Sequence, residues 1–159
     1  MLGENEKERF MQEAIRLAVE NVQRGGGPFG AVVVKAGRIL ATGVNRVTAN
    51  HDPTAHAEVQ AIREACRTLG THQLTECELY TSCEPCPMCI GAIYWARPKA
   101  VYYASTKEEA AAIRFDDQFI YEELAKPIEG RALPMKRLTP EGYHAPFDAW
   151  SRLEEKIEY

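Results

Sequence analysis

The sequence predicts an α/β fold in which a sheet carries helices on both of its faces. Apolar residues recur with helical periodicity in some segments and form short, β-rich runs in others, and up to about residue 105 the two kinds of segment alternate. The length of 159 residues, with 45% hydrophobic and 26% charged residues, is typical of one globular domain, residues 1–159.

The first part of the chain predicts a helix followed by a β-hairpin. Gly25-Gly26-Gly27-Pro28 ends a helix over residues 7–24. Residues 29–34 and 39–44 are β-rich runs, and Lys35-Ala36-Gly37-Arg38 between them favours a tight turn. Along the helix, the i, i+3, i+4, i+7 pattern of an amphipathic helix is formed by Met11, Ala14, Ile15, Ala18 and Val22.

A second helix is predicted over residues 56–69, after the polar segment 45–55. Asp52-Pro53-Thr54 suits its start, because Asp or Thr can cap a helix and Pro fits a first turn. Gly70 ends it. The side chains that this helix would bury are Ile62, Ala65, Cys66 and Leu69.

Two more strands and a helix complete the alternating part of the chain. Residues 78–82 predict a short buried strand and residues 100–104 predict another. Between them, residues 86–96 predict a helix, which has to end before Pro98 because the residue before a proline disfavours helical backbone.

The pattern is weaker beyond residue 105. Ser105-Thr106-Lys107-Glu108-Glu109 contains a capping box for a further helix. Residues 115–125 predict one more helix, stopped by Pro127. A strand near residues 133–138 and a helix over residues 146–157 would close the chain.

Composition and charge exclude several classes of protein. With 19 basic and 23 acidic residues, a net charge of −4 and a pI near 5.6, the chain lacks the basic field that nucleic-acid binding requires. The polar N-terminus is not a secretory signal, and no run approaches the ~18 apolar residues of a membrane span. Five cysteines, odd in number and unevenly spaced, favour reduced thiols in the cytoplasm. We therefore expect a cytoplasmic protein with neither a nucleic-acid nor a membrane partner.

The segment from His56 to Cys89 contains the side chains of a catalytic zinc site. His56, Cys86 and Cys89 offer one imidazole and two thiols, and three protein ligands leave a position for water or substrate. Cys86 and Cys89 are three residues apart and share one face of a helix, whose N-terminus also favours thiolates. Two thiolates and a neutral imidazole leave a Zn²⁺ site neutral, so Glu58 serves better as a proton carrier than as a fourth ligand.

Spacing alone leaves other interpretations of these residues open. A Cys-x-x-Cys pair also occurs in structural zinc sites and redox sites. Cys83, Cys86 and Cys89 together could indicate an iron–sulfur cluster, although such a cluster usually needs a fourth cysteine. A fourth ligand from Cys83 or Glu58 would instead close the site and make the zinc structural, as in a binding module.

The zinc motif resembles that of a known superfamily. His56-Ala57-Glu58 followed by Pro85-Cys86-Pro87-Met88-Cys89 resembles the signature of the zinc-dependent nucleobase deaminases. This resemblance implies the cytidine-deaminase-like fold, a three-layer α/β/α arrangement around a mixed five-stranded sheet. Within the superfamily, the chain is similar to the bacterial guanine deaminases over nearly its whole length. The stretches that carry this similarity are residues 27–31, 50–58, 79–89, 92–98, 115–117 and the terminal Glu158-Tyr159.

The resemblance implies a role for each matching residue in catalysis. His56, Cys86 and Cys89 would bind one Zn²⁺ per subunit. Glu58 would take a proton from water and pass it to a ring nitrogen of the substrate. Asp117 would contact the amidine edge of the base and act as a second proton shuttle for the departing ammonia.

The resemblance also implies which residues bind the substrate. Asn45 and the backbone at Ala57 would form hydrogen bonds to the purine, and Phe29 would lie against the base. Tyr159 would close the pocket, and it can come from the partner subunit of a homodimer that exchanges its C-terminal segments. Without the resemblance, Phe29 would be assigned to the core, Asn45 to a turn, Asp117 to a helix cap and Tyr159 to a frayed terminus.

The implied reaction is hydrolysis of guanine to xanthine and ammonia, a step of purine metabolism. The alternatives share the zinc motif and differ in substrate, which would be guanosine, cytosine or an adenosine of tRNA. A structural-zinc binding module is the alternative from another class. The acidic composition disfavours the tRNA substrate, because binding of tRNA calls for a basic groove.

Overall fold

The protein is described by a computed structural model that covers residues 3–159. The chain divides after Gln118 into two compact units, Met1–Gln118 and Phe119–Tyr159. All buried side chains of the described residues belong to the first unit. That unit also contains the sheet and the residues of the zinc motif.

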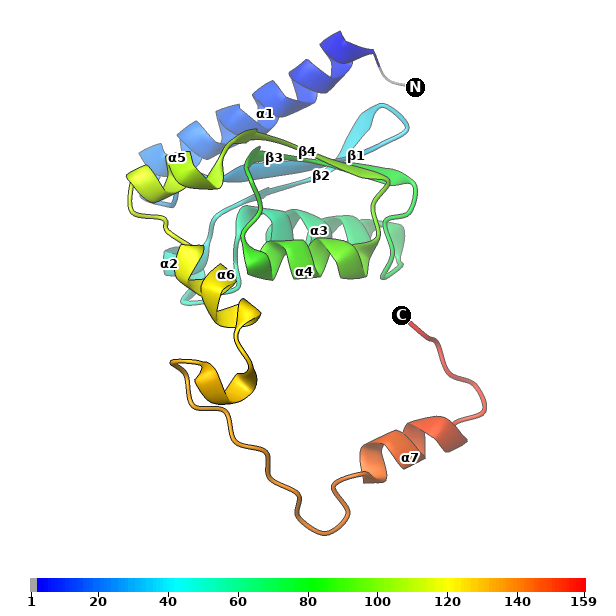
Figure 1. The fold of residues 1–159 in the computed structure, drawn as a ribbon. Helices are drawn as coiled ribbons and strands as arrows, with labels where there is room; N and C mark the ends of the chain where they lie inside the picture. The colour runs from blue at the N-terminus through cyan, green and yellow to red at the C-terminus, as the bar shows by residue number, and fades with distance from the viewer. Residues whose placement is uncertain (1–2) are drawn as a thin grey trace. The chain divides into compact units, whose positions relative to one another are not determined.

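A mixed sheet forms the centre of the first unit (Figure 1). Its strands are β1 (Gly30–Lys35), β2 (Arg38–Val44), β3 (Cys77–Cys83) and β4 (Ala100–Ser105), in the order β2-β1-β3-β4. β1 is antiparallel to both of its neighbours, whereas β3 and β4 are parallel. The four predicted strands of the alternating part are thus confirmed, with ends that shift by one or two residues.

The expected fifth strand is absent from this sheet, which has four strands. Residues 133–138 form no strand, and the second unit has no strand among its described residues with which they could pair. A single extended segment is not stable without a partner, and Pro134 lacks one of the N–H groups that a ladder needs. The prediction of a strand there was wrong for this structure because sequence patterns do not specify a partner.

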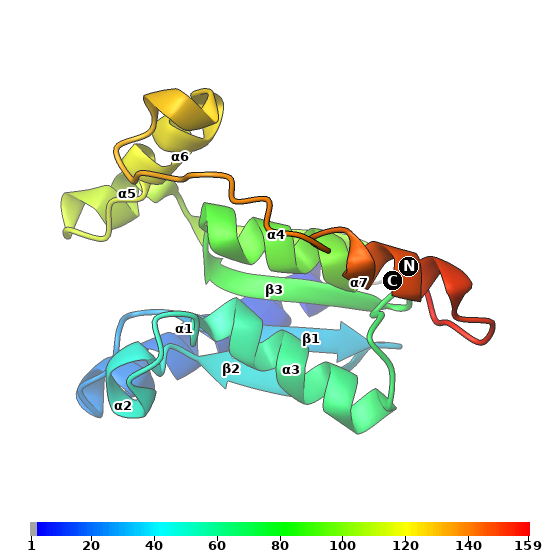
Figure 2. The same cartoon turned by 90° about the horizontal axis from the view of Figure 1, so that it is seen from below.

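Helices cover both faces of the sheet, which confirms the predicted three layers (Figures 1 and 2). One face carries α1 (Glu4–Gln23), and the other carries α3 (Ala57–Leu69) and α4 (Pro87–Ala96) side by side. Shorter helices are α2 (Val47–Asn50) and α5 (Lys107–Ala112), and α5 begins with the predicted capping box of Thr106 and Glu109. Among residues 3–159, no helix has the length and apolar composition to cross a membrane.

Two glycines let the helices lie directly against the strands. A Cβ atom at Gly30 in β1 would lie 2.3 Å from the Ala14 carbonyl oxygen of α1, and one at Gly43 in β2 would lie 2.2 Å from the Ala57 carbonyl oxygen of α3. Side chains are excluded at both positions. The Gly43 contact also fixes the first turn of α3, which holds the His-x-Glu part of the zinc motif.

The hairpin turn and the core agree with the sequence pattern. Ala36 and Gly37 have φ angles of 49° and 72°, as the turn of a two-residue hairpin requires. Alternate residues of β1 pack on opposite sides, Val33 toward α3 and Val32 toward α1. On the α1 side, Val32 packs with Phe10 and Tyr80.

The second unit consists of short helices joined by extended chain. α6 (Gln118–Ala125) leads into it, followed by a 3-10 helix, η1 (Ile128–Gly130), and by α7 (Ala145–Arg152). The predicted helices over residues 115–125 and 146–157 are confirmed in part, because both are shorter than expected. None of the side chains in this unit is buried, and the most exposed hydrophobic ones are Leu133, Leu138, Phe147, Ile157 and Tyr159.

Candidate active site

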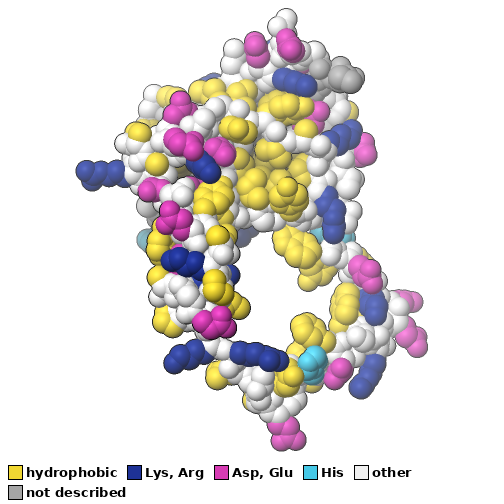
Figure 3. All heavy atoms as spheres, viewed as in Figure 1, with side chains coloured by type: hydrophobic (Ala, Val, Ile, Leu, Met, Phe, Trp, Pro, Cys, Tyr) yellow, Lys and Arg dark blue, Asp and Glu magenta, His cyan; other side chains and the backbone are white. Residues whose placement is uncertain are grey.

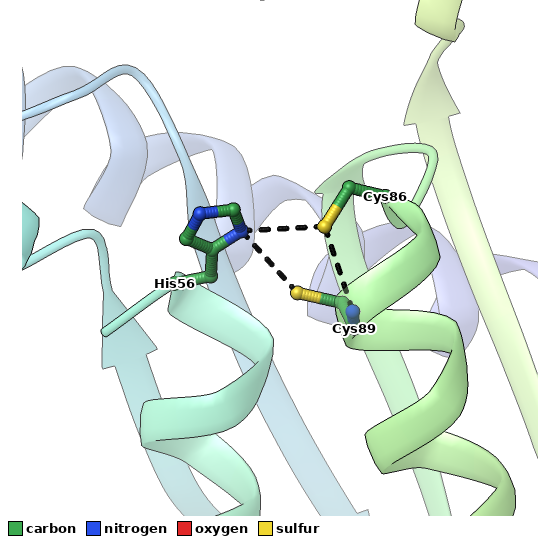
Figure 4. Close-up of side chains that lie close together, drawn as sticks. All are labelled: His56, Cys86 and Cys89. Atoms are coloured by element: carbon green, nitrogen blue, oxygen red, sulfur yellow. Dashed lines mark hydrogen bonds between the residues drawn. The ribbon is translucent and has the colours of Figure 1, made fainter. Parts of the chain in front are cut away.

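The three predicted zinc ligands come together at the starts of two helices. His56 is the residue before α3, Cys86 is the residue before α4, and Cys89 lies in the first turn of α4. Their ligand atoms all lie within 4.8 Å of one another. Figure 4 shows the imidazole of His56 facing the two sulfur atoms across the space between the helices.

The local backbone explains why these side chains meet. Cys86 caps α4, since its Sγ accepts a hydrogen bond from the Cys89 N–H at 3.5 Å, and Pro87 occupies the first turn. His56 is the N-cap residue of α3, but its side chain makes no hydrogen bond to the helix. Its ring instead points toward the cysteines. The expectation that Asp52 or Thr54 caps this helix was wrong. Asp52 instead accepts a hydrogen bond from the Thr54 N–H at 2.8 Å, closing a turn before the helix begins.

The two distances from His56 to the sulfur atoms are close to those of a zinc site. The Nδ1 atom of His56 lies 3.4 Å from the Sγ of Cys86 and 3.4 Å from the Sγ of Cys89. An imidazole nitrogen and a thiolate that bind one zinc ion at its usual bond lengths are about 3.6 Å apart in tetrahedral geometry. One nitrogen and two sulfur donors are also a usual ligand set for zinc, so the residues present fit this metal.

The electrostatics of the two thiols differ. Hydrogen bonds from Cys89 and His56 lower the pKa of Cys86 to about 4. The same hydrogen bond with Cys86, together with burial, raises the pKa of the Cys89 thiol. The hydrogen bond to Cys86 raises the pKa of His56 as well. One thiolate is thus already stabilised, and zinc binding would displace the protons that remain.

Glu58 lies beside the ligands but is not one of the three. It belongs to the first turn of α3 and is 6% exposed, and its Oε2 lies 3.4 Å from the Sγ of Cys89. Burial raises the pKa of this carboxyl group. A carboxyl group that can hold a proton next to a metal site is suited to proton transfer. Its Oε1 contacts the Thr81 hydroxyl at 3.1 Å, a contact that the sequence patterns did not reveal.

Cys83 lies at the end of β3 and does not join the ligand group. It is buried, and its Sγ faces the carbonyl oxygen of Thr106 at 3.8 Å. Burial raises the pKa of Cys83 to about 11, which favours the neutral thiol. The geometry therefore supports neither an iron–sulfur site nor a zinc site closed by Cys83.

Phe29 and Asn45 lie together where the two strands of the hairpin begin and end. The Asn45 N–H donates to the Phe29 carbonyl oxygen at 3.2 Å. The Asn45 Oδ1 accepts a hydrogen bond from the Val47 N–H at 3.1 Å, which orients the amide and leaves its Nδ2 donor outside that bond. Ala57 is fully buried in the first turn of α3.

Asn21 is a residue of this region that the sequence analysis missed. Its Nδ2 donates to the carbonyl oxygens of Gly27 at 2.8 Å and Asn45 at 2.9 Å. It thereby joins the end of α1 to both flanks of the hairpin. The available signal was its position, since Asn21 continues the buried face of α1 after Ala14 and Ala18.

The chain after α5 brings two more candidate residues into the first unit. The ring of Phe115 packs edge-on against Phe29, with centroids 5.0 Å apart. Arg114, just before it, has a φ of 74°, a conformation that turns the chain sharply at a cost of roughly 1–2 kcal/mol for a residue with a side chain. Burial and the charge of Cys86 raise the pKa of Asp117, two residues further on.

Tyr159 lies in the second unit, and its role in the pocket stays a prediction.

Comparisons with known proteins agree with this site. Residues 4–105 match the family of the cytidine and deoxycytidylate deaminase zinc-binding region. The chain is 58% identical to guanine deaminase of Bacillus subtilis over 153 residues, which are 96% of this chain and 98% of that protein. The X-ray structure of guanine deaminase from Bacillus subtilis matches with a TM-score of 0.93 at 57% identity, covering 96% of this chain and 98% of that one. A tRNA-specific adenosine deaminase of Aquifex aeolicus is 41% identical over 107 residues, 67% of this chain and 71% of that protein.

The matched region runs from α1 to β4 and includes both helix starts that carry the ligands. With the three candidate ligands together at two helix starts, a buried carboxyl group beside them and the family match over residues 4–105, the chain belongs to the cytidine and deoxycytidylate deaminase family of zinc enzymes.

Proposed function

We propose that the protein is a zinc-dependent guanine deaminase that hydrolyses guanine to xanthine and ammonia. The observation that carries this proposal is the identity of 58% to the Bacillus subtilis guanine deaminase along 96% of the chain. The tRNA-specific relative, in contrast, covers only 67% of the chain. A small purine base also suits an acidic protein of net charge −4, which has no general attraction for a polyanion.

His56, Cys86 and Cys89 would hold one zinc ion. When bound, zinc supplies a Lewis acid that makes water a nucleophile at neutral pH. Glu58 takes one proton of the attacking water and gives it to the ring nitrogen next to C2 of guanine, where it stays in xanthine; the proton of the hydroxyl added at C2 then passes to the amino group, and the C2–N bond breaks to release ammonia as C2=O forms. The buried position of Glu58 supports this role, because a carboxyl group with a raised pKa can hold the proton between the two transfers.

The substrate-binding roles of Phe29, Asn45, Ala57 and Asp117 are part of the proposal. The oriented amide of Asn45 offers its Nδ2 as a donor to an acceptor atom of the purine. The edge-to-face pair of Phe29 and Phe115 offers an aromatic surface for the base. Asp117 accepts from the amidine edge of guanine and shuttles a proton to the departing ammonia.

We further propose a single enzyme domain, residues 1–159, whose C-terminal segment is exchanged between the two subunits of a homodimer. Figure 3 shows hydrophobic side chains at the surface along the second unit and also where β4 and α4 face the viewer. Phe147, Leu153 and Ile157 are 70%, 48% and 74% exposed, which is costly unless another chain covers them. Exchange would also bring Tyr159 to the pocket of the partner subunit. The thiolate ligands favour the cytoplasm, where thiols are kept reduced.

The substrate is tested by measuring ammonia release from guanine, guanosine, adenine, cytosine and cytidine under identical conditions, with the zinc content of the protein determined in parallel. We expect guanine to have the highest kcat/KM. A higher kcat/KM for any of the other four would replace guanine as the substrate. A zinc-loaded protein that releases ammonia from none of them would contradict the proposal.

Exchange of the C-terminal segment is tested by complementation. Glu58→Gln disables one subunit, and deletion of Tyr159 disables the other. In a mixed dimer with exchanged segments, the subunit that lacks Tyr159 receives the intact terminus of its partner, so co-expression restores one active site of two. Without exchange, neither subunit combines Glu58 with Tyr159, and the mixed dimer stays inactive.

A further inference from the structure

Thr81 joins the proton carrier to the centre of the sheet. It lies in β3, pairs with Ala31 of β1 and Tyr103 of β4, and is 1% exposed. Its Oγ1 lies 3.1 Å from the Oε1 of Glu58 and 3.1 Å from the carbonyl oxygen of Cys83. The hydroxyl is thus a buried polar group whose two partners are a carboxyl oxygen and a main-chain oxygen.

We propose that Thr81 is a positioning residue for Glu58. Its hydroxyl holds Oε1 against β3, and this leaves Oε2 on the side of Cys89, 3.4 Å from the sulfur. A glutamate side chain has three rotatable bonds, and the carboxyl group of Glu58 has a hydrogen bond to its own backbone in α3 besides the one to Thr81. The hydrogen bond to the strand selects one rotamer and directs one carboxyl oxygen to the reacting groups. This inference rests on the proposed function, because it assigns Thr81 a part in the proton transfers of Glu58.

The donors and acceptors around Thr81 suit a carboxyl group that gains and loses a proton during each turnover. A hydroxyl has one proton to donate and lone pairs to accept, whereas the Cys83 carbonyl oxygen can only accept. When Glu58 is ionised, Thr81 donates to Oε1. When Oε1 carries a proton, Glu58 donates to Thr81, and Thr81 turns its own proton to the Cys83 carbonyl oxygen. In both states the proton of the Thr81 hydroxyl has an acceptor, without movement of any heavy atom.

Threonine suits this position better than other hydroxyl-bearing residues. Its β-branched side chain is stiff at χ1 and is favoured in strands, so the γ-methyl group fixes the direction of the oxygen. Valine has nearly the same shape and offers neither a donor nor an acceptor. Exchange of Thr81 for Val therefore removes the hydrogen bonds while the packing of β3 is retained.

The neighbouring Ser82 provides a matched control. It is also buried in β3, but it lies on the other face of the sheet, where its Oγ accepts a hydrogen bond from the Gly30 N–H at 3.0 Å. Ser82→Ala removes a buried hydroxyl from the same strand without touching Glu58. We expect it to lower stability and to leave kcat within about twofold of the wild-type value, since it breaks a structural hydrogen bond only.

The test compares Thr81→Val, Thr81→Ser and Thr81→Ala by kcat and KM for ammonia release from guanine and by zinc content. We expect Thr81→Val to lower kcat by about tenfold to a hundredfold, the effect of one hydrogen bond to a charged group, with KM and zinc content unchanged. Thr81→Ser should recover most of the loss. Ser and Ala both lack the γ-methyl group. The ratio of kcat between Thr81→Ser and Thr81→Ala therefore measures the contribution of the hydroxyl even where Thr81→Val disturbs folding. A wild-type kcat in Thr81→Val, a Ser variant as slow as Ala, or loss of zinc would overturn the proposal.

A second readout does not depend on the substrate. The carboxyl band of Glu58 can be isolated as the infrared difference between the wild-type protein and Glu58→Gln. We expect this band to shift in Thr81→Val and to stay in place in Thr81→Ser and Ser82→Ala. A wild-type protein that is inactive on guanine would contradict the proposed function alone, and the infrared shift would then decide the role of Thr81. An unshifted band in Thr81→Val would overturn it.

Discussion

Both units of this chain contain aromatic and aliphatic side chains, but the first unit buries many of them and the second leaves them exposed. In residues 3–118, alternate strand residues and one face of each long helix form two hydrophobic clusters against the sheet. In residues 119–159, aromatic and aliphatic side chains such as Phe147 and Leu138 are 70% and 83% exposed. The first unit thus has a hydrophobic core of its own, whereas residues 119–159 bury none of their side chains, which is the pattern that the proposed exchange of C-terminal segments would explain.

The two units also differ in which residues of the candidate site they contain. The first unit contains the three candidate zinc ligands, the proposed proton carrier Glu58 and four of the five proposed substrate-binding residues, among them Asp117. The second unit contains Tyr159, the residue proposed to close the pocket. The candidate zinc ligands and Glu58 thus all belong to the packed unit, and the proposed closure of the pocket by Tyr159 would come from the unit without buried side chains.

The largest effect is expected from Glu58→Gln, which tests the chemistry of the first unit. The amide cannot carry the proton, so kcat should fall by about 10²- to 10⁴-fold while zinc content is retained. His56→Ala is the matched variant, since it removes a ligand and should lose both zinc and activity. Metal analysis and steady-state kinetics separate the two. A Glu58→Gln enzyme with near wild-type kcat would show that another group carries the proton.

The second prediction concerns the exposed aromatic residues of α7. Changing Phe147 and Trp150 to Ser should weaken the proposed dimer by about thirtyfold or more, because such side chains act as hot spots when an interface buries them. Ser151→Ala, on the same helix, should change the dissociation constant little. Sedimentation velocity over a range of protein concentrations measures the effect. A wild-type protein that is a fully active monomer would contradict the proposal that a second subunit covers the exposed side chains of residues 119–159.

The third prediction tests how tightly each unit is packed. In Gly43→Ala the new methyl group would lie 2.2 Å from the Ala57 carbonyl oxygen, and overpacking of this kind should lower the free energy of unfolding by about 1–3 kcal/mol. In Gly130→Ala of the second unit, the nearest atom would be 3.8 Å away, so we expect little change. Urea unfolding followed by circular dichroism compares the two variants. Equal stabilities would mean that α3 does not approach β2 as closely as described.

The smallest effect on stability is expected when the pH is lowered until Glu123 becomes protonated. The hydrogen bonds with Lys126 and with the Ala132 N–H lower the pKa of Glu123. The pKa of Glu123 is lower in the folded than in the unfolded protein. Its contribution to the free energy of unfolding is therefore fully present at pH values above the ordinary pKa of a glutamate, and it is lost as the pH falls through the pKa of the folded state. The amide resonance of Ala132 should move in that lower window in NMR spectra. Glu123→Gln should abolish the movement, and its persistence would assign the shift to another group.

Much of the first unit and its metal site was predictable from the sequence because the relevant signals are local. The period of the apolar residues marks α1 and α3, Gly70 ends α3 with a φ of 64°, and the Thr106 capping box begins α5. The order of His56, Glu58, Cys86 and Cys89 indicates a zinc deaminase because three ligands and a free carboxylate fit that chemistry. Local signals also produced errors, since Asp52 closes a turn rather than capping a helix.

The sequence itself determined the residue types of the site and the local spacings, His56 to Glu58 and Cys86 to Cys89, that act within one helix start. Contacts between distant segments were decided by the tertiary structure alone. Thr81 meets Glu58 across 23 positions and Asn21 meets Asn45 across 24, and no pattern along the chain specifies either pair. The same reason explains the missing fifth strand, because a strand exists only where a second one lies beside it.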